Sequence, residues 1–330
     1  VLYQEGEEHH RQRRMTARFF TPKTTSEKYR QMMNNLADTI LDELRQKKQA
    51  DLSKLSMTMA VKVAAQVVGL TDSLLPGMDA RINSFFAGGD MDVKWTPRSI
   101  FNLVRRQFTV LQFLYLDVKP AIRRRRQDPQ EDVISHLLTQ NATVPEILTE
   151  CITYGAAGMA TTREFICIAA WHMLENPELR AYYLSASEDK RQNLLQEILR
   201  LEPVVGNLTR RATHDLVVES EGRQYTIPTG ALLDIHIGTA NLDLSVVGAE
   251  PRAICPERSL HAERTTPALL SFGDGAHRCP GAYIAIQESD IFLQKLLAIE
   301  GLQIERAPSL SWGDLTQGYE FRNFRLKVNR

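Results

Sequence analysis

The chain has 330 residues, 43% of them hydrophobic, and its 40 basic and 40 acidic side chains give a formal net charge of zero. A neutral chain is a poor candidate for bulk nucleic-acid binding, which needs an excess of positive charge. No apolar run is long enough to span a membrane, and the first residues do not have the pattern of a signal peptide. Four cysteines in so long a chain do not suggest a disulfide framework, so we expect a reducing, cytoplasmic location.

The first predicted element is a helix over residues 7–20 that stops near the Thr21-Pro22 step. On such a helix His9 and Arg13 share one face. The opposite face carries three arginines: Arg11, Arg14 and Arg18. This basic face is either an ordinary solvated surface or a docking patch for an acidic partner.

The next part of the chain carries amphipathic helices without recognisable chemistry. Residues 26–69 have this pattern, and a further helical block begins at Trp95 and runs to the four arginines at 123–126. Cations suit the end of a helix because of its dipole. We therefore interpret this arginine run as a solvated helix end rather than a nucleic-acid patch.

Residues 145–174 are predicted to form one long apolar helix. Its stripe comprises Ile147, Glu150, Tyr154, Ala157, Gly158, Thr161, Phe165 and Ile168. Two glycines, Gly155 and Gly158, lie inside this helix and lower its stability. They indicate either close helix packing or a flat group that lies against the backbone.

Two weaker patterns follow the long helix. Glu197 and Arg200 stand three residues apart on a predicted helix, a spacing that is common on exposed surfaces. Residues 215–220 and 224–237 alternate as strands do, with a turn at residues 227–230.

The last motif is a glycine-rich turn over residues 272–281 that leads into a helix. It places Cys279 next to Pro280, which suits a first helical position. We expect the helix N-terminus to favour the thiolate form of Cys279. A thiolate held in this way is a suitable axial ligand for haem iron.

This turn resembles the haem loop of the cytochrome P-450 family. The matching positions are Phe272, Gly273, Gly275, His277, Cys279 and Gly281. The resemblance extends over essentially the whole chain in the family's order. It implies a mainly α fold with small β-sheets, in which haem lies between the long central helix and the cysteine loop. It also implies that residues 1–330 form a single domain that lacks the family's N-terminal helices and part of its β-sheet.

The resemblance also assigns roles to particular residues. The implied cofactor is haem b, with the Cys279 thiolate as axial ligand and with Phe272, Gly273 and Gly281 shaping the loop. The propionate ligands would be His9, Arg13, Arg210 and His277, with His10 and Arg211 as rivals of two of them. Ala157 and Gly158 would open a groove for dioxygen, and Thr161 would manage protons. Glu197, Arg200 and Arg258 would form a buried structural network.

One position departs from the family pattern. The family usually has Asp or Glu before the threonine, and this chain has Ala160 there. Glu150 and Glu164 are near the same face, but neither replaces the acid by position. We still expect oxygen activation, with protons supplied through water or by a group of the substrate.

The implied function is haem-thiolate monooxygenation, in which one atom of dioxygen enters an apolar organic substrate. The electrons would come from a separate ferredoxin, or another electron-transfer protein, and its reductase. Two alternatives remain open. The chain could be a peroxygenase driven by peroxide, or it could be a haem-binding or degenerate, non-catalytic interaction module.

Overall fold

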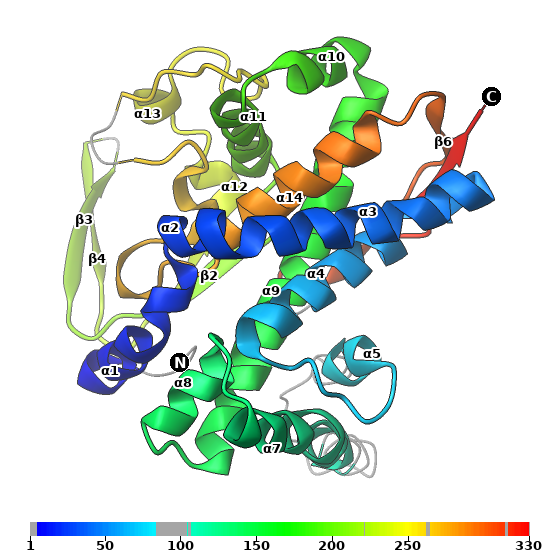
Figure 1. The fold of residues 1–330 in the computed structure, drawn as a ribbon. Helices are drawn as coiled ribbons and strands as arrows, with labels where there is room; N and C mark the ends of the chain where they lie inside the picture. The colour runs from blue at the N-terminus through cyan, green and yellow to red at the C-terminus, as the bar shows by residue number, and fades with distance from the viewer. Residues whose placement is uncertain are drawn as a thin grey trace.

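The computed structural model describes residues 5–83, 104, 107–220, 222–261, 265–313 and 316–329. Most of this chain is helical (Figure 1). The helices before the long central one are α1 (Gly6–Thr16), α2 (Pro22–Thr24), α3 (Arg30–Lys47), α4 (Leu52–Val68), α5 (Met78–Asn83), α7 (Lys119–Gln127) and α8 (Val133–Thr139). The others are α9 (Val144–Glu175), α10 (Pro177–Ser185), α11 (Glu188–Leu201), α12 (Ile237–Ala240), α13 (Leu244–Val247) and α14 (Ala282–Leu297).

Short turns of other helix types extend or join these elements. Two are π-helical, η2 (Thr25–Tyr29) and η3 (Leu114–Val118), and three are 3₁₀ turns, η1 (Ala17–Phe20), η4 (Leu269–Phe272) and η5 (Gly275–His277). The helix predicted over residues 7–20 is therefore α1 continued by η1. Thr21 then caps α2 by accepting a hydrogen bond from the Thr24 N–H.

The strands are short and antiparallel. They are β1 (Gln49–Asp51), β2 (Asn207–Arg211), β3 (Leu216–Ser220), β4 (Arg223–Ile227), β5 (Leu232–His236), β6 (Leu302–Arg306), β7 (Ser309–Gly313), β8 (Gly318–Arg322) and β9 (Arg325–Val328). β9 lies between β1 and β6, with Ala50 opposite Leu326, and the other pairs are β2–β5, β3–β4 and β7–β8. The prediction of a mainly α fold with small β-sheets is confirmed.

The central helix α9 follows from signals at its two ends. Thr143 and Glu146 form a capping box, and Pro145 occupies the first turn, where a missing N–H is harmless. At the other end Asn176 caps α10 and thereby separates the two helices. α9 spans 32 residues, so the prediction of one long helix from residue 145 to 174 is confirmed.

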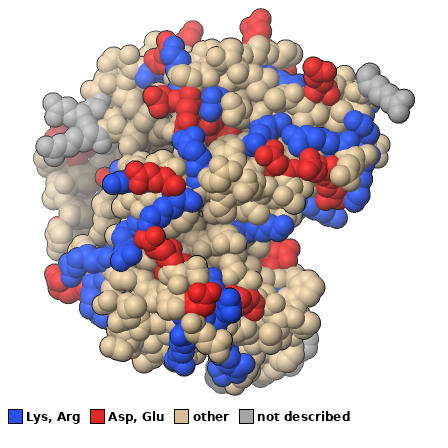
Figure 2. All heavy atoms as spheres, in the orientation of Figure 1, with Lys and Arg blue, Asp and Glu red and all other residues tan. Residues whose placement is uncertain are grey.

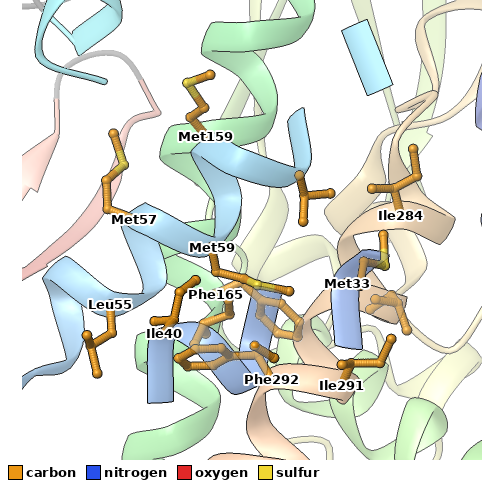
Figure 3. Packing of buried hydrophobic residues seen from close by; sticks show 14 of the residues in the cluster. Met33, Ile40, Leu55, Met57, Met59, Met159, Phe165, Ile284, Ile291 and Phe292 are labelled. Atoms are coloured by element: carbon orange, nitrogen blue, oxygen red, sulfur yellow. The ribbon is translucent and has the colours of Figure 1, made fainter. Parts of the chain in front are cut away.

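Four helices enclose the main hydrophobic core. α4 packs along α9, while α14 contacts both α3 and α9 (Figure 1). Figure 3 shows Met33 of α3, Met59 of α4, Phe165 of α9 and Phe292 of α14 meeting in this core, and all four are buried. This packing fixes α9 and α14 relative to each other, so it also fixes the loop that leads into α14.

Two details correct the sequence predictions. α14 begins at Ala282 with Gly281 as its N-cap, so Pro280 precedes the helix instead of occupying its first position. Arg125, in the arginine run, is buried and binds Asp132 and Asp72, the latter at 3.0 Å, so this part of the run is not solvated. The predicted start of that block at Trp95 lies outside the described residues.

None of the described helices combines the length and apolar character needed to cross a membrane.

Candidate active site around Cys279

The cysteine loop is closed by its own backbone. Gly273 and Gly275 have φ values of +67° and +64°, a left-handed conformation that glycine adopts without strain. Within the turn the Cys279 N–H donates to the Phe272 carbonyl at 2.8 Å, and the Arg278 N–H donates to the Gly275 carbonyl at 3.1 Å. These bonds hold Cys279 in a fixed, exposed position ahead of α14.

The environment of the Cys279 sulfur differs from the prediction. Although the residue keeps an exposed surface, protein atoms crowd round its sulfur, and this desolvation raises the pKa of the thiol. The Gly281 N–H and the positive charges of Arg13 and Arg278 lower that pKa only in part. The helix N-terminus therefore does not by itself favour the thiolate, and deprotonation would have to come from a coordinated metal ion.

Helix α1 meets the cysteine loop directly. Arg13 Nη2 donates to the Arg278 carbonyl at 2.7 Å. The His9 and His277 rings stack with centroids 4.1 Å apart and an interplanar angle of 22°. His9 is buried and His10 is exposed, so His9 is the member of the pair that faces the loop, as predicted from its distance to Thr21-Pro22.

The two stacked histidines have unused hydrogen-bonding atoms. His9 Nδ1 and His277 Nε2 are buried and hydrogen-bond to nothing among the described residues, although His277 Nε2 lies 3.2 Å from a Glu5 oxygen. Burial is the main cause that lowers the pKa of His9, and the positive charges of His277 and Arg13 lower it further. The buried His9 nitrogen has no acceptor, and a carboxylate already approaches the His277 nitrogen, so this group of residues fits a haem propionate.

Arg210 and Arg211 lie at the end of strand β2. Successive side chains of a strand point to opposite faces, so Leu208 and Arg210 share one face. A methyl group built on Gly273 would lie 3.9 Å from Leu208 Cδ1, so this face is the one directed at the cysteine loop. Arg211 belongs to the other face and donates to the Gly230 carbonyl at 2.7 Å. This arrangement favours Arg210 over its rival as the residue near the loop.

On α9, the Thr161 hydroxyl donates to the Ala157 carbonyl at 2.6 Å, and Ala157 itself is exposed. A methyl group on Gly158 would lie 3.7 Å from the Ala64 Cβ of α4, which is an ordinary contact. Helix packing therefore does not require a glycine at residue 158.

The predicted Glu–Arg–Arg cluster exists and is buried. Glu197 accepts from Arg200 at 2.7 and 2.8 Å and from Arg258 at 2.9 Å. Burial by itself would raise the pKa of Glu197, but these bonds and the Cys255 N–H hold it below its usual value. A complete charge cluster of this kind tolerates burial, whereas the loss of one partner would be strongly destabilising.

Asn241, to which the sequence assigned no role, connects this cluster to the cysteine loop. Arg200 donates to the Asn241 carbonyl at 2.9 Å. The fully buried Asn241 amide in turn donates to Ser271 Oγ at 2.9 Å and accepts from the Leu270 N–H at 3.0 Å. The cluster thus supports the η4 turn immediately before the loop. A lone asparagine in the sequence carries no signal for this role.

The acidic residues near α9 have distinct environments. Glu164 accepts hydrogen bonds from Arg322 and from the Phe321 N–H, both at 2.8 Å. These bonds connect α9 to strand β8. Glu150 is buried, and this burial raises its pKa to about 7. Glu288 of α14, which the sequence did not single out, is buried beside Thr162 and has a pKa raised by burial to about 8.

Comparisons with known proteins agree with this geometry. The model of the family described as cytochrome P-450 matches residues 191–299, which include most of α11, the cysteine loop and α14. The chain is 28% identical over 324 residues to the biotin biosynthesis cytochrome P-450 of Bacillus subtilis, which covers 97% of this chain and 75% of the relative. It is 25% identical to the erythromycin C-12 hydroxylase of Saccharopolyspora erythraea, which covers 91% of this chain and 72% of the relative.

Solved structures show the same fold. The complex of the cytochrome BioI with an acyl carrier protein ligated to hexadec-9Z-enoic acid aligns with a TM-score of 0.80 and 26% identity, over 99% of this chain and 81% of that one. The enzyme CYP109B1 from Bacillus subtilis aligns with a TM-score of 0.81 and 21% identity, over 98% and 85% of the two chains.

The fold and the cysteine-centred site define a haem-thiolate protein. The family model and the relatives are all cytochromes P-450, one of them named as a hydroxylase, and this similarity supports an oxidoreductase of the monooxygenase class.

Proposed function

We propose that this chain inserts one atom of dioxygen into an apolar organic substrate, with electrons delivered by a separate redox protein. The observation that supports this most strongly is the meeting of α1 with the cysteine loop. There Arg13 holds the loop at the Arg278 carbonyl, and His9 stacks on His277 with a buried nitrogen left unpaired. A cofactor that bears carboxylates would supply the missing acceptor beside the only exposed thiol among the described residues.

In this proposal the proximal residues hold haem b. Cys279 is the thiolate ligand, and Phe272, Gly273 and Gly281 shape the loop around it. The propionates are bound by His9, Arg13, Arg210 and His277, because charge-assisted hydrogen bonds to a carboxylate are strong. When bound, the haem supplies the iron at which dioxygen is activated.

The residues of α9 manage oxygen and protons. Ala157 and Gly158 leave space beside the helix for dioxygen. Thr161 donates its proton to the Ala157 carbonyl, so its oxygen is free to accept a proton-bearing water. Since residue 160 is an alanine and Glu164 is engaged by Arg322, the first proton donor in this scheme is water held by Thr161.

The electron donor would dock on the outer face of α1. Arg11 is paired with Glu8 at 2.8 Å and Arg18 lies 3.6 Å from Glu131, so the predicted patch is less positive than the sequence indicates. Figure 2 shows basic and acidic side chains mixed over the face of the molecule in view, without a large patch of one sign. We propose a ferredoxin or a similar electron-transfer protein as the partner, in the cytoplasm, where the four free cysteines would stay reduced.

The comparisons suggest which apolar substrate to test first. One relative acts in biotin biosynthesis, and one similar structure holds an acyl carrier protein ligated to a C16 fatty acid. An acyl chain presented by a carrier protein is therefore the first class to try, followed by large apolar rings, which the hydroxylase relative suggests.

The first test is the absorbance spectrum of the reduced, carbon-monoxide-bound protein after loading with haem. A strongly red-shifted Soret band is expected, because Cys279 would ligate iron as a thiolate, and Cys279→Ser should abolish the shift. Failure to bind haem, or a shifted band that survives in Cys279→Ser, would contradict the proposal and favour a non-catalytic interaction module.

A second test separates the monooxygenase from the peroxygenase alternative, which Ala160 favours. Turnover should require dioxygen, a ferredoxin and its reductase. Turnover with hydrogen peroxide alone, at an equal or higher rate, would instead support the peroxygenase.

A further inference from the structure

A small cavity lies between α1, the turn after α8 and the beginning of α9. It has a volume of about 100 Å³, and its polar lining includes Gln12, Thr16, Asn141, Glu146 and Glu150. A water molecule occupies ~30 Å³ of liquid, so the cavity accommodates a few particles of that size. It is too small for an organic substrate, since pockets for small molecules usually exceed ~300 Å³.

Two buried oxygen atoms at this cavity have no hydrogen-bond partner among the described residues. They are Glu150 Oε2 and Gln12 Oε1, and only 5% of the Glu150 surface is exposed. The Gln12 amide nitrogen faces the Glu8 carboxylate at 3.5 Å, which assigns the amide oxygen to the interior. A buried acceptor without a donor destabilises the fold, so a donor or a cation in this cavity would stabilise the region.

The charges around the cavity favour a cation. α1 contributes Arg11, but both oxygens of Glu8 bind its guanidinium, at 2.8 and 3.1 Å. The turn after α8 contributes neutral side chains, and α9 contributes Glu146 and Glu150. Among the described residues one arginine thus stands against three carboxylates when Glu150 is ionised, and the positive charge of the chain's N-terminus also lowers the pKa of Glu150.

Two neighbouring features of α9 do not change this balance of charges around the cavity. The dipole of α9 acts mainly within its first turn, and Glu146 there already offsets it. Burial raises the pKa of both Tyr154 and Cys151, the nearest other titratable groups of α9, so both stay neutral near pH 7.

We propose that this cavity binds a compact monovalent cation, potassium or ammonium, through Glu150 Oε2 and Gln12 Oε1. A divalent ion fits less well because Ca²⁺ sites usually supply several carboxylates. Here Glu150 is the only carboxylate that is both buried and unpaired at the cavity among the described residues, since Glu146 is engaged in the capping box.

Proton binding and cation binding compete at this site. Without a cation, burial holds the pKa of Glu150 at about 7, so the carboxyl group is partly protonated near neutral pH. A bound cation favours the ionised form and lowers that pKa. Cation affinity should therefore rise with pH.

The proposed ion would join the two helices that matter for the proposed function. α1 carries His9 and Arg13, and α9 carries Thr161. The adjacent hydrogen bond between Thr16 and Tyr154, 2.5 Å long, already connects these helices. An ion at Gln12 and Glu150 would add a second connection one turn away, so it acts as a positioning element and not as a catalytic group.

The direct test is a carboxyl ¹³C NMR titration of the whole haem-loaded chain in its reduced, carbon-monoxide-bound, diamagnetic form. Spectra are compared in potassium, ammonium and tetramethylammonium chloride at equal ionic strength, and the Glu150 signal is identified by its absence in Glu150→Gln. The expected result is a titration midpoint at least one pH unit lower in potassium or ammonium, which corresponds to a tenfold weaker proton affinity. An unchanged midpoint in both, or an equal fall in tetramethylammonium, would overturn the proposal and leave a water-filled cavity.

Thermal unfolding provides an independent readout. Potassium or ammonium should raise the melting temperature in a saturable way, and Gln12→Met should weaken this response at least tenfold in cation concentration while leaving the Glu150 carboxyl in place. Glu219→Gln, at an exposed position of β3, is the matched control and should respond as the unmodified chain does. If Gln12→Met and Glu150→Gln both keep the full response, the ion binds elsewhere and the proposal is wrong.

Discussion

His9 and His277 lie ring against ring, 4.1 Å apart, although one belongs to α1 and the other to the cysteine loop. Each has a buried nitrogen without a hydrogen-bond partner among the described residues. In the proposed function both donate to a haem carboxylate, and this pair leads to the first prediction.

His9→Phe should keep the stacked packing and lose the donor. A hydrogen bond to a charged group contributes about 1.5–3 kcal/mol, so haem should dissociate roughly 10- to 100-fold faster, while the haem-free chain unfolds at nearly the same temperature. The measurement is haem transfer to apomyoglobin. His10→Phe is the control, since His10 is exposed, and equal effects of the two substitutions would contradict the prediction.

Arg210 and Arg211 offer a matched pair on β2. Because Arg210 shares the face of Leu208, which is directed at Gly273, Arg210→Ala should weaken haem binding about tenfold or more. Arg211→Ala should change haem affinity less than twofold and affect only the bond to Gly230. Haem affinity measured by titration decides this, and a larger loss in Arg211→Ala would reverse the assignment.

Gly158→Ala should stabilise the haem-free chain. The added methyl group meets Ala64 at an ordinary contact distance, and alanine favours a helix over glycine by about 1 kcal/mol. In contrast, Gly206→Ala would place a methyl group 2.0 Å from the Gln317 carbonyl oxygen and should destabilise the fold. Thermal unfolding of both variants tests the pair. A lower melting temperature for Gly158→Ala would show that α4 and α9 need the glycine.

Glu288 predicts a dependence of stability on pH. Burial raises its pKa in the folded chain to about 8, above the ordinary value of 4.5. Between these two values the folded state holds a proton that the unfolded state has released, so this residue's contribution to stability falls as the pH rises from about 4.5 to about 8.

Glu288→Gln should remove this dependence. The variant should gain stability relative to the unmodified chain by roughly 3 kcal/mol when the pH rises from 5 to 8. Urea unfolding at both pH values measures this. If Glu288→Gln changes the free energy of unfolding by the same amount at pH 5 and at pH 8, Glu288 does not titrate in this range.

Pro280 lacks an N–H group, and the donor to the Cys279 sulfur is instead the Gly281 N–H. Pro280→Leu restores a possible second donor, which would withdraw charge from the sulfur and raise the reduction potential of the haem. Spectroelectrochemical titration measures the potential, with Tyr283→Phe, at an exposed position of α14, as the control. An unchanged or lower potential would contradict the prediction.

The sequence predicted the features that depend on neighbouring residues. The apolar stripe over residues 145–174 predicted α9, and helical periodicity placed His9 and Arg13 on one face of α1. The spacing of glycines around Cys279 predicted a tight turn. These predictions succeeded because the interactions that produce them act within a few residues along the chain.

Local patterns were less informative where distant segments meet. The arginine run at residues 123–126 reads as solvated, yet Arg125 is buried against Asp72 and Asp132. Pro280 has the character of a first helical residue, yet α14 begins two residues later with Gly281 as its cap. Glu164 is near the same face of α9 in the sequence pattern, and only the fold pairs it with Arg322.

By itself, the sequence determined the long central helix, the register of α1 and the turn that presents Cys279, because hydrogen bonding and side-chain periodicity within one segment set all three. Only the tertiary structure decided that Leu208 of β2 approaches Gly273 of the loop, that Asn241 supports the loop, and that Gln12 and Glu150 share a cavity. These relationships depend on burial and on contacts between segments far apart in the chain. Their energies come from desolvation and pairing, which no single segment contains.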